Sequence, residues 1–120
     1  DYYPEVRTIS EGKFHATDWV NMKDRVVATE GFVTAYGSSE YNEDFAETYA
    51  MYVSYNKEGW QKIIDQAGEK GAPIINKKVD IVRKYFKSTW NIDIDRMREI
   101  LEKRSKEAAE LDLRHYDFSK

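Results

Sequence analysis

The strongest constraint on the fold is a helical repeat of apolar residues in the middle of the chain. From residue 42 to residue 55, apolar side chains recur at three- and four-residue steps: Phe45, Tyr49, Tyr52 and Val53. This spacing places them along one side of an α-helix. Glu43 and Asp44 suit the positive end of the helix dipole, and Ser39 or Asn42 can cap its start. We therefore predict a helix from Asn42 to Tyr55.

The same periodicity predicts two helices after this one. Asn56 can cap the first, whose apolar side carries Trp60, Ile63, Ile64 and Ala67. Gly68 and Gly71 end it, because glycine is a poor residue for a helix interior. Pro73 suits the first turn of the next helix, where its missing N–H costs nothing.

A final helix follows a break at Trp90 and Asn91, and Asp93 or Asp95 caps its start. Its apolar seam is narrow and consists of Ile94, Met97, Leu101, Ala108 and Leu111. Most other positions of this helix are charged, which predicts a solvated outer face. The sequence thus predicts an all-α fold of several packed helices.

The residues before the central helix predict an irregular N-terminal arm. Asp1 to Lys13 carries a proline and a glycine and shows no sustained apolar period, which indicates a loop. A short helix is predicted from Asp24 to Thr29, and Gly31 to Tyr36 is predicted to be extended. We interpret residues 1–120 as a single helical domain and, because the chain starts at Asp1 without methionine, as a mature or truncated piece of a longer precursor.

Composition excludes several classes of function. The hydrophobic content is 41% and the charged content 34%, which is ordinary for a globular protein. The net charge is −3 and no block of lysine or arginine stands out, so nucleic-acid binding is not expected. With no cysteine, the chain has neither disulfides nor a thiolate metal site. No apolar run approaches the roughly 20 residues of a membrane-spanning helix.

The candidate chemistry lies between residues 36 and 47. Tyr36 precedes the predicted central helix, and Glu43 and Glu47 stand one turn apart on it, so both glutamates project from one face. A pair of glutamates at this spacing is most often a solvated surface pair. Here the neighbours Phe45 and Tyr49 are apolar, and a carboxylate in partly dry surroundings needs a cation or hydrogen-bond donors.

Other polar and aromatic residues have simpler interpretations. His15 and His115 have no second histidine at a ligand spacing, so both are expected at exposed, non-functional positions. Trp19, Trp60 and Trp90 are expected to be core or half-core anchors.

The segment from Tyr36 to Glu47 resembles zinc metallopeptidases of the gluzincin group, which join H-E-x-x-H on one helix to a glutamate on a later helix. Tyr-Gly, five residues and then E-x-F-A-E resemble the catalytic segment of the anthrax lethal factor type. Most of residues 1–113 further resembles the C-terminal half of zinc metallohydrolase lipoproteins of Bacteroidetes. The motifs that carry this resemblance are G-F-V-T-A-Y, N-E-D-F-A-E-T-Y-A-M-Y-V, V-D-I-V-R-K-Y-F-K and W-N-I-D-I-D.

The resemblance implies a role for each candidate residue. Glu43 matches the third zinc ligand, Tyr36 matches the tyrosine that stabilises the oxyanion or protonates the leaving amine, and Glu47 matches a carboxylate behind the metal ligands. H-E-x-x-H itself is absent from these 120 residues and in the family lies a short way upstream. The resemblance therefore implies zinc in the intact parent, with the missing N-terminal half as partner, and we expect this chain alone to bind no zinc and to be inactive.

The resemblance also implies a peptide or glycoprotein substrate and a place in the cell envelope, as an outer-membrane lipoprotein or a periplasmic protein, with a lipid anchor upstream as the only membrane contact. Two alternatives stay open from the residues. The chain can be a non-catalytic helical interaction module associated with a cell-surface nutrient-import system, or a structural domain whose Glu43 and Glu47 face solvent.

Overall fold

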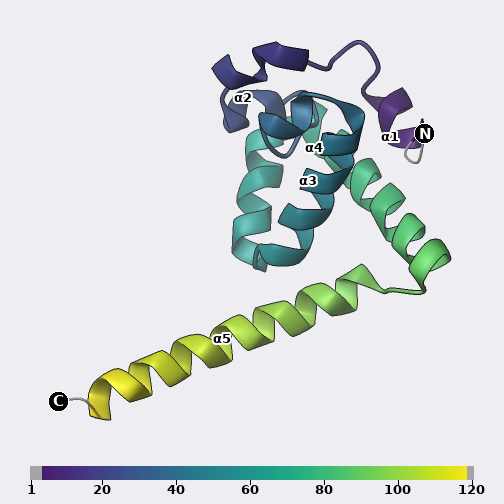
Figure 1. Ribbon diagram of the computed structural model, residues 1–120. Coiled ribbons are helices and arrows are strands. Elements are labelled where there is room, and N and C mark those ends of the chain that lie inside the picture. The colour runs from purple at the N-terminus through teal and green to yellow at the C-terminus, as the bar shows by residue number, and fades with distance from the viewer. Residues whose placement is uncertain (1–3, 119–120) are drawn as a thin grey trace.

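The computed structural model describes the backbone of residues 4–118 and the side chains of residues 5–111. Every regular element in this part is a helix, and no strand occurs in it, which confirms the all-α prediction (Figure 1). The elements are α1 (Pro4–Ile9), the 3-10 helix η1 (Ala16–Asn21), α2 (Asp24–Ala28), the 3-10 helix η2 (Tyr36–Ser38), α3 (Tyr41–Ser54), α4 (Lys57–Trp90) and α5 (Ile94–Phe118). None of the helices in the described part combines the length and hydropathy that a bilayer crossing requires.

Helix α3 is the centre of the fold and lies between the two segments of α4 (Figure 1). It begins within one residue of the predicted start, but its cap residue is Glu40, whose backbone is extended and whose side chain makes no capping bond. The predicted apolar stripe is the buried side: Phe45, Tyr52 and Val53 belong to the main core, and Tyr49 packs against it.

Helix α4 is two helical segments joined at Gly68, where φ is +69° and ψ is −166°. The prediction of two helices broken at this glycine is thus correct, and Asn56 caps the first segment by accepting a 2.7 Å hydrogen bond from the Gly59 N–H. Gly71 lies just inside the second segment, so it does not end a helix. A side chain there is excluded because a Cβ would stand 2.0 Å from the Ala28 carbonyl oxygen of α2.

Aromatic contacts join α3 to both segments of α4. The rings of Tyr52 and Trp60 meet edge to face with centroids 5.1 Å apart, which ties α3 to the first segment. Tyr49 stacks on Phe86 of the second segment at 4.4 Å, and Phe45 meets Tyr85 edge to face at 5.3 Å. These geometries are the ones that aromatic pairs prefer, so the predicted stripe of α3 is clamped on two sides.

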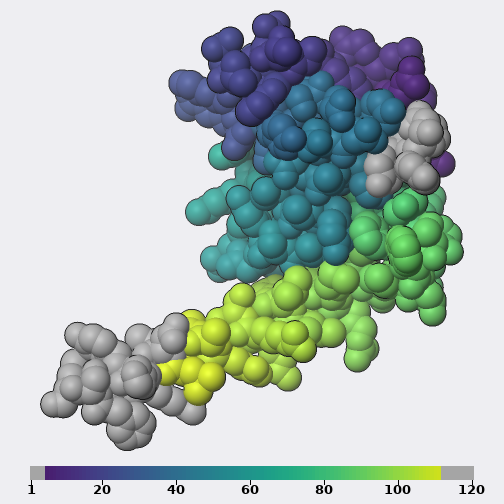
Figure 2. Space-filling view, in the orientation of Figure 1, coloured from purple at the N-terminus to yellow at the C-terminus, as the bar shows by residue number. Residues whose placement is uncertain are grey.

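The last helix, α5, is anchored at its start and then leaves the rest of the molecule (Figure 2). Asp93 caps it by accepting hydrogen bonds from the N–H groups of Asp95 and Arg96, at 3.0 and 3.2 Å. Asp95 in turn accepts from the Tyr52 hydroxyl and, at 2.7 Å, from Arg83. The predicted seam is buried only here: Ile94 is fully buried, while Leu111 is 61% exposed.

The N-terminal arm is more regular than its composition suggests. Within the segment predicted as a loop, residues 4–9 form α1, and its Val6 is buried in the main core. The predicted helix at residues 24–29 is present as α2. Residues 31–36 are not extended throughout, because the chain enters the 3-10 turn η2 at Tyr36. Trp60 is buried as predicted, but Trp90 is 62% exposed and is not a core anchor.

The break in α4 allows a test of the backbone alone. No atom lies within 4 Å of a Cβ placed on Gly68, so substitution causes no clash. Its φ and ψ nevertheless fall in a region that is essentially restricted to glycine. Gly68→Ala should therefore lower the free energy of unfolding by about 1–3 kcal/mol, measured by urea denaturation.

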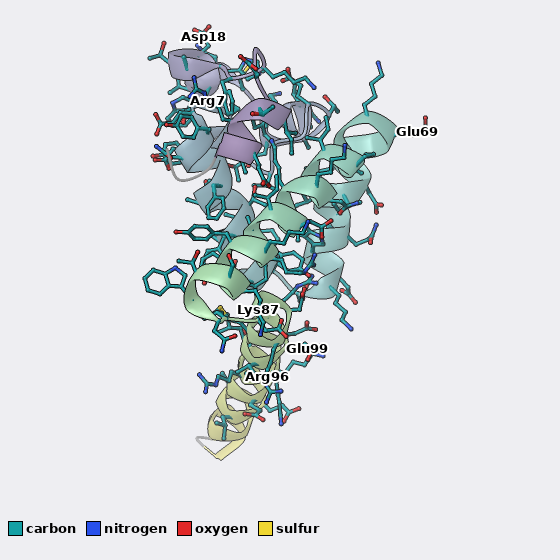
Figure 3. The ribbon with its side chains drawn as sticks, turned by 90° about the vertical axis from the view of Figure 1, so that its right-hand side faces the viewer. Arg7, Asp18, Glu69, Lys87, Arg96 and Glu99 are labelled. Carbon is teal, nitrogen blue, oxygen red and sulfur yellow. The ribbon has the colours of Figure 1, made fainter. Side chains whose placement is uncertain are left out.

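The matched control is Glu69→Ala at the next position, whose exposed side chain lies at the outer edge of the molecule (Figure 3). It should change stability by less than about 0.5 kcal/mol. Equal stability of Gly68→Ala and the wild-type chain would show that the break does not require glycine.

Candidate functional site

Tyr36, Glu43 and Glu47 are brought together where η2 meets the first two turns of α3. A hydrogen bond with the Glu43 side chain, together with the negative charges of Glu43, Glu47 and Glu40, raises the pKa of the Tyr36 phenol above its ordinary value of 10.0. Tyr36 therefore keeps its proton at neutral pH and remains a hydrogen-bond donor. The residue is 42% exposed, so this donor stands at the surface of the described part of the chain.

Glu47 is held by the loop that precedes η2. The Thr34 hydroxyl donates a 3.1 Å hydrogen bond to Glu47 Oε1 and accepts one of 2.9 Å from the Gly37 N–H. Gly37 also packs closely on α3, since a Cβ there would lie 3.5 Å from the Glu47 Cβ. Glu47 thus fixes the turn that carries Tyr36. This contact accords with the position behind the metal ligands that was predicted for Glu47, although it does not test it.

The Tyr36 ring is supported from the other side by Trp19 of η1. The two rings meet edge to face, with centroids 5.1 Å apart. Trp19 itself packs on a small second core formed by Val27, Phe32 and Ala35. The arm therefore supports the phenol, and the structure agrees with the half-core position expected for Trp19.

Beneath the site lies a buried ion pair that the sequence analysis missed. Lys78 of α4 places its Nζ 2.7 Å from Asp44 Oδ2, and both side chains are almost fully buried. The same ammonium group donates a 2.7 Å hydrogen bond to the Gly31 carbonyl oxygen and lies 4.1 Å from the centre of the Phe32 ring. Burial raises the pKa of Asp44 to about 6, against the opposing effect of Lys78, and burial lowers the pKa of Lys78.

A signal for this pair was present in the sequence. Ile75, Val79 and Val82 form the buried stripe of the second segment of α4, and Lys78 occupies a position on the same stripe. A lysine on the apolar side of a helix is rarely buried without a partner. The identity of the partner was not predictable, because Asp44 is distant in sequence and its acidic neighbour Glu43 was as good a candidate.

The prediction that both histidines are exposed is wrong for His15. His15 is half-buried, and its Nε2 lies 2.8 Å from Glu30 Oε1. Its backbone N–H donates a 2.8 Å hydrogen bond to the Ser38 carbonyl oxygen at the end of η2. His15 is thus a structural link between the arm and η2 and not an exposed residue. The side chain of His115 lies outside the described residues.

The candidate residues fit one side of a metal site. No group of three histidine, cysteine or acidic side chains that could hold a metal ion occurs in the described part of the chain. Glu43 is half-exposed, next to a protonated phenol and on the first turn of a helix. Its carboxylate can serve as one oxygen ligand to a zinc ion, and the remaining ligands would have to come from elsewhere.

Comparison with known proteins identifies the family of the chain. The family model described as "Putative zinc-binding metallo-peptidase" matches residues 1–95. The chain belongs to this family. The matched region includes α1 to α4 and therefore every candidate residue, whereas most of α5 lies beyond it.

A solved structure supports the same family. The crystal structure at 2.10 Å of a protein from Bacteroides caccae ATCC 43185, also described as a putative zinc-binding metallo-peptidase, has a TM-score of 0.85 and 41% sequence identity. The alignment covers 91% of this chain and 42% of the Bacteroides chain. This chain therefore spans less than half the length of that relative. A search of curated proteins found no match.

The buried ion pair allows a test of its energetics. Lys78→Met leaves the Asp44 carboxylate buried without its cation, which should lower the free energy of unfolding by about 3–5 kcal/mol. The double variant Asp44→Leu/Lys78→Met removes both charges and fills the same space, so it should recover most of that loss. Urea denaturation measures both, and a double variant as unstable as the single one would contradict this explanation.

Proposed function

We propose that this chain forms the C-terminal half of a zinc-dependent metallopeptidase. In this proposal Glu43 is a zinc ligand, Tyr36 is the transition-state donor, and Glu47 holds the turn that carries Tyr36. The observation that carries the proposal is the packing of the turn that carries Tyr36 on the start of α3, where Glu43 and Glu47 project, in a member of a zinc-binding metallo-peptidase family.

The charges around Tyr36 support a cation at this place. Three glutamates, Glu40, Glu43 and Glu47, raise the pKa of the same phenol, and the negative field that does so also attracts a metal ion. Zinc in such a site supplies Lewis acidity toward the scissile carbonyl and lowers the pKa of a water toward about 7. Glu43 would hold it through a carboxylate oxygen, with two imidazoles supplied from outside this chain.

Tyr36 provides the chemistry that this chain itself contributes. Its raised pKa keeps the phenol protonated, so the hydroxyl can donate a hydrogen bond where negative charge develops on the substrate oxygen. The Thr34 hydroxyl links the turn to Glu47, and Trp19 packs against the ring. A donor fixed in this way loses little free energy to reorganisation during the reaction.

The chain should not hydrolyse peptides by itself. It contains no H-E-x-x-H sequence, so it provides neither the imidazole ligands nor the glutamate base that the proposal needs. We propose that a preceding segment of a longer polypeptide supplies them, and that this parent is a lipid-anchored or periplasmic protein of the cell envelope acting on peptide or glycoprotein. The resemblance to lipoproteins encoded beside nutrient-import systems supports this placement.

A second function has one observation in its favour. Because the printed sequence lacks H-E-x-x-H, the domain can instead be a degenerate relative that binds a component of a nutrient-import system. The coding sequence upstream of Asp1 discriminates between the two. H-E-x-x-H within that sequence supports the peptidase, and its absence supports the interaction module.

Removing the proposed ligand should weaken metal binding in the longer protein. Glu43→Gln keeps the size of the side chain and removes its charge, so zinc affinity should fall by more than about 100-fold, since loss of a supporting group alone costs about 10–100-fold. Competition with a zinc chelator measures this affinity. Glu58→Gln, an exposed glutamate in the first turn of α4, should stay close to the wild type; unchanged affinity in Glu43→Gln would exclude Glu43 as a ligand.

Removing the proposed donor should affect turnover and leave the metal bound. In the same longer protein, Tyr36→Phe should lower kcat by about 100- to 1000-fold, the usual cost of losing one oxyanion donor, with zinc content unchanged. Turnover of a fluorogenic peptide and zinc analysis of the same sample measure the two quantities. Wild-type turnover in Tyr36→Phe would remove the phenol from the mechanism.

A further inference from the structure

The buried ammonium group of Lys78 contacts two separate segments of the chain. It lies 2.7 Å from Asp44 Oδ2 on α3 and donates a 2.7 Å hydrogen bond to the Gly31 carbonyl oxygen. The Phe32 ring lies 4.1 Å away on a further side. Lys78 itself belongs to the second segment of α4, whose neighbouring residues on the same face are core residues.

These two contacts lie at the bases of the two segments that carry the candidate site residues. Asp44 directly follows Glu43 on α3, so the ion pair fixes the first turn of the helix that presents the carboxylate. Gly31 and Phe32 begin the loop that ends at Tyr36 and presents the phenol. One buried cation on α4 therefore binds both the segment that carries Tyr36 and the segment that carries Glu43.

The loop between Gly31 and Tyr36 is short, and further hydrogen bonds fix its conformation. The Phe32 N–H donates to the Val27 carbonyl oxygen at 3.1 Å, and the Ala35 N–H donates to Asp24 Oδ1 at 2.7 Å. Its conformation is thus fixed relative to α2. The contact of Lys78 with Gly31 joins this loop to α4 and, through Asp44, to α3.

The buried Lys78–Asp44 ion pair is not the arrangement expected if stability were its only role. Asp44 Oδ1 is buried without a hydrogen-bond partner among the described residues, and burying a charged pair costs much of what the pair returns. Apolar residues of similar size often serve stability as well or better. A directional link between three segments is what an apolar cluster does not provide.

We propose that Lys78 is a positioning residue that, through Asp44 and Gly31, sets the turn that carries Tyr36 against the start of α3 that carries Glu43. The catalytic meaning of this role rests on the proposed function, but the positioning itself is a property of this chain. Among the described residues, Lys78 contacts Asp44, Gly31 and Phe32. It therefore acts through neighbours of Glu43 and Tyr36.

The test measures the influence of Glu43 on Tyr36 in this 120-residue chain. Tyrosines labelled with ¹³C at Cζ give NMR signals that respond to hydrogen bonding of the phenol, and Tyr36→Phe identifies the signal of Tyr36. Glu43→Gln marks the position of that signal when the charged partner is absent. At constant neutral pH, Asp44→Leu/Lys78→Met should move the Tyr36 signal toward this position while circular dichroism shows a folded helical chain.

The matched control weakens a different tie of comparable kind. Asp95→Asn disrupts the contacts of Asp95 with Tyr52 and Arg83 at the start of α5, away from Tyr36, so it should lower stability without moving the Tyr36 signal. The single variant Lys78→Met should move the signal in the same direction as the double variant in whatever fraction remains folded.

Two results would overturn the proposal. One is a folded double variant whose Tyr36 signal coincides with that of the wild type; the other is a shift of equal size in Asp95→Asn, which would make the effect one of general stability. Failure of the proposed function is detected separately, because zinc affinity unchanged by Glu43→Gln in the longer protein would leave the NMR comparison as it is.

Discussion

A single buried ammonium group joins three segments of this domain. Lys78 enters the core from α4 and binds an acidic residue of α3 and a backbone carbonyl of the loop after α2. No apolar side chain in its place could join these segments at a defined position, because hydrophobic contact has no direction. The helices by themselves would pack through their aromatic stripes, but those stripes do not fix where the loop at residues 31–38 lies on α3.

The candidate site is a consequence of this arrangement. Its carboxylate and its phenol come from different segments, and neither segment alone places them together. The helix start provides Glu43 in a field that favours anions, and the 3-10 turn η2 packs on the same two turns of α3 and carries Tyr36. Both groups are partly exposed, so a molecule that binds this surface can reach them. A site of this kind is assembled by the packing of two segments.

Much of the fold follows from local sequence, and the residues show why. The stripe of Phe45, Tyr49 and Tyr52 predicts α3 because its period is set within the helix itself, and Asn56 and Asp93 cap helices through bonds only a few residues long. The exposure of Trp90 and the helix α1 were not predictable in the same way. They depend on which distant surface each residue meets, and a tryptophan at a helix end has no local signal for that.

The candidate residues illustrate the same limit more sharply. Tyr36, Glu43 and Glu47 were identified from spacing and from resemblance, and the structure brings the three together at one place. The buried ion pair of Asp44 and Lys78 was missed, because the two residues lie in different helices and no local pattern shows that they are in contact. Glu43 and Asp44 are adjacent acids at one helix start, yet one faces outward and the other is fully buried. The two side chains point in different directions around α3. The buried acid therefore binds a cation of the chain itself, and the outward acid is left available for a cation from outside.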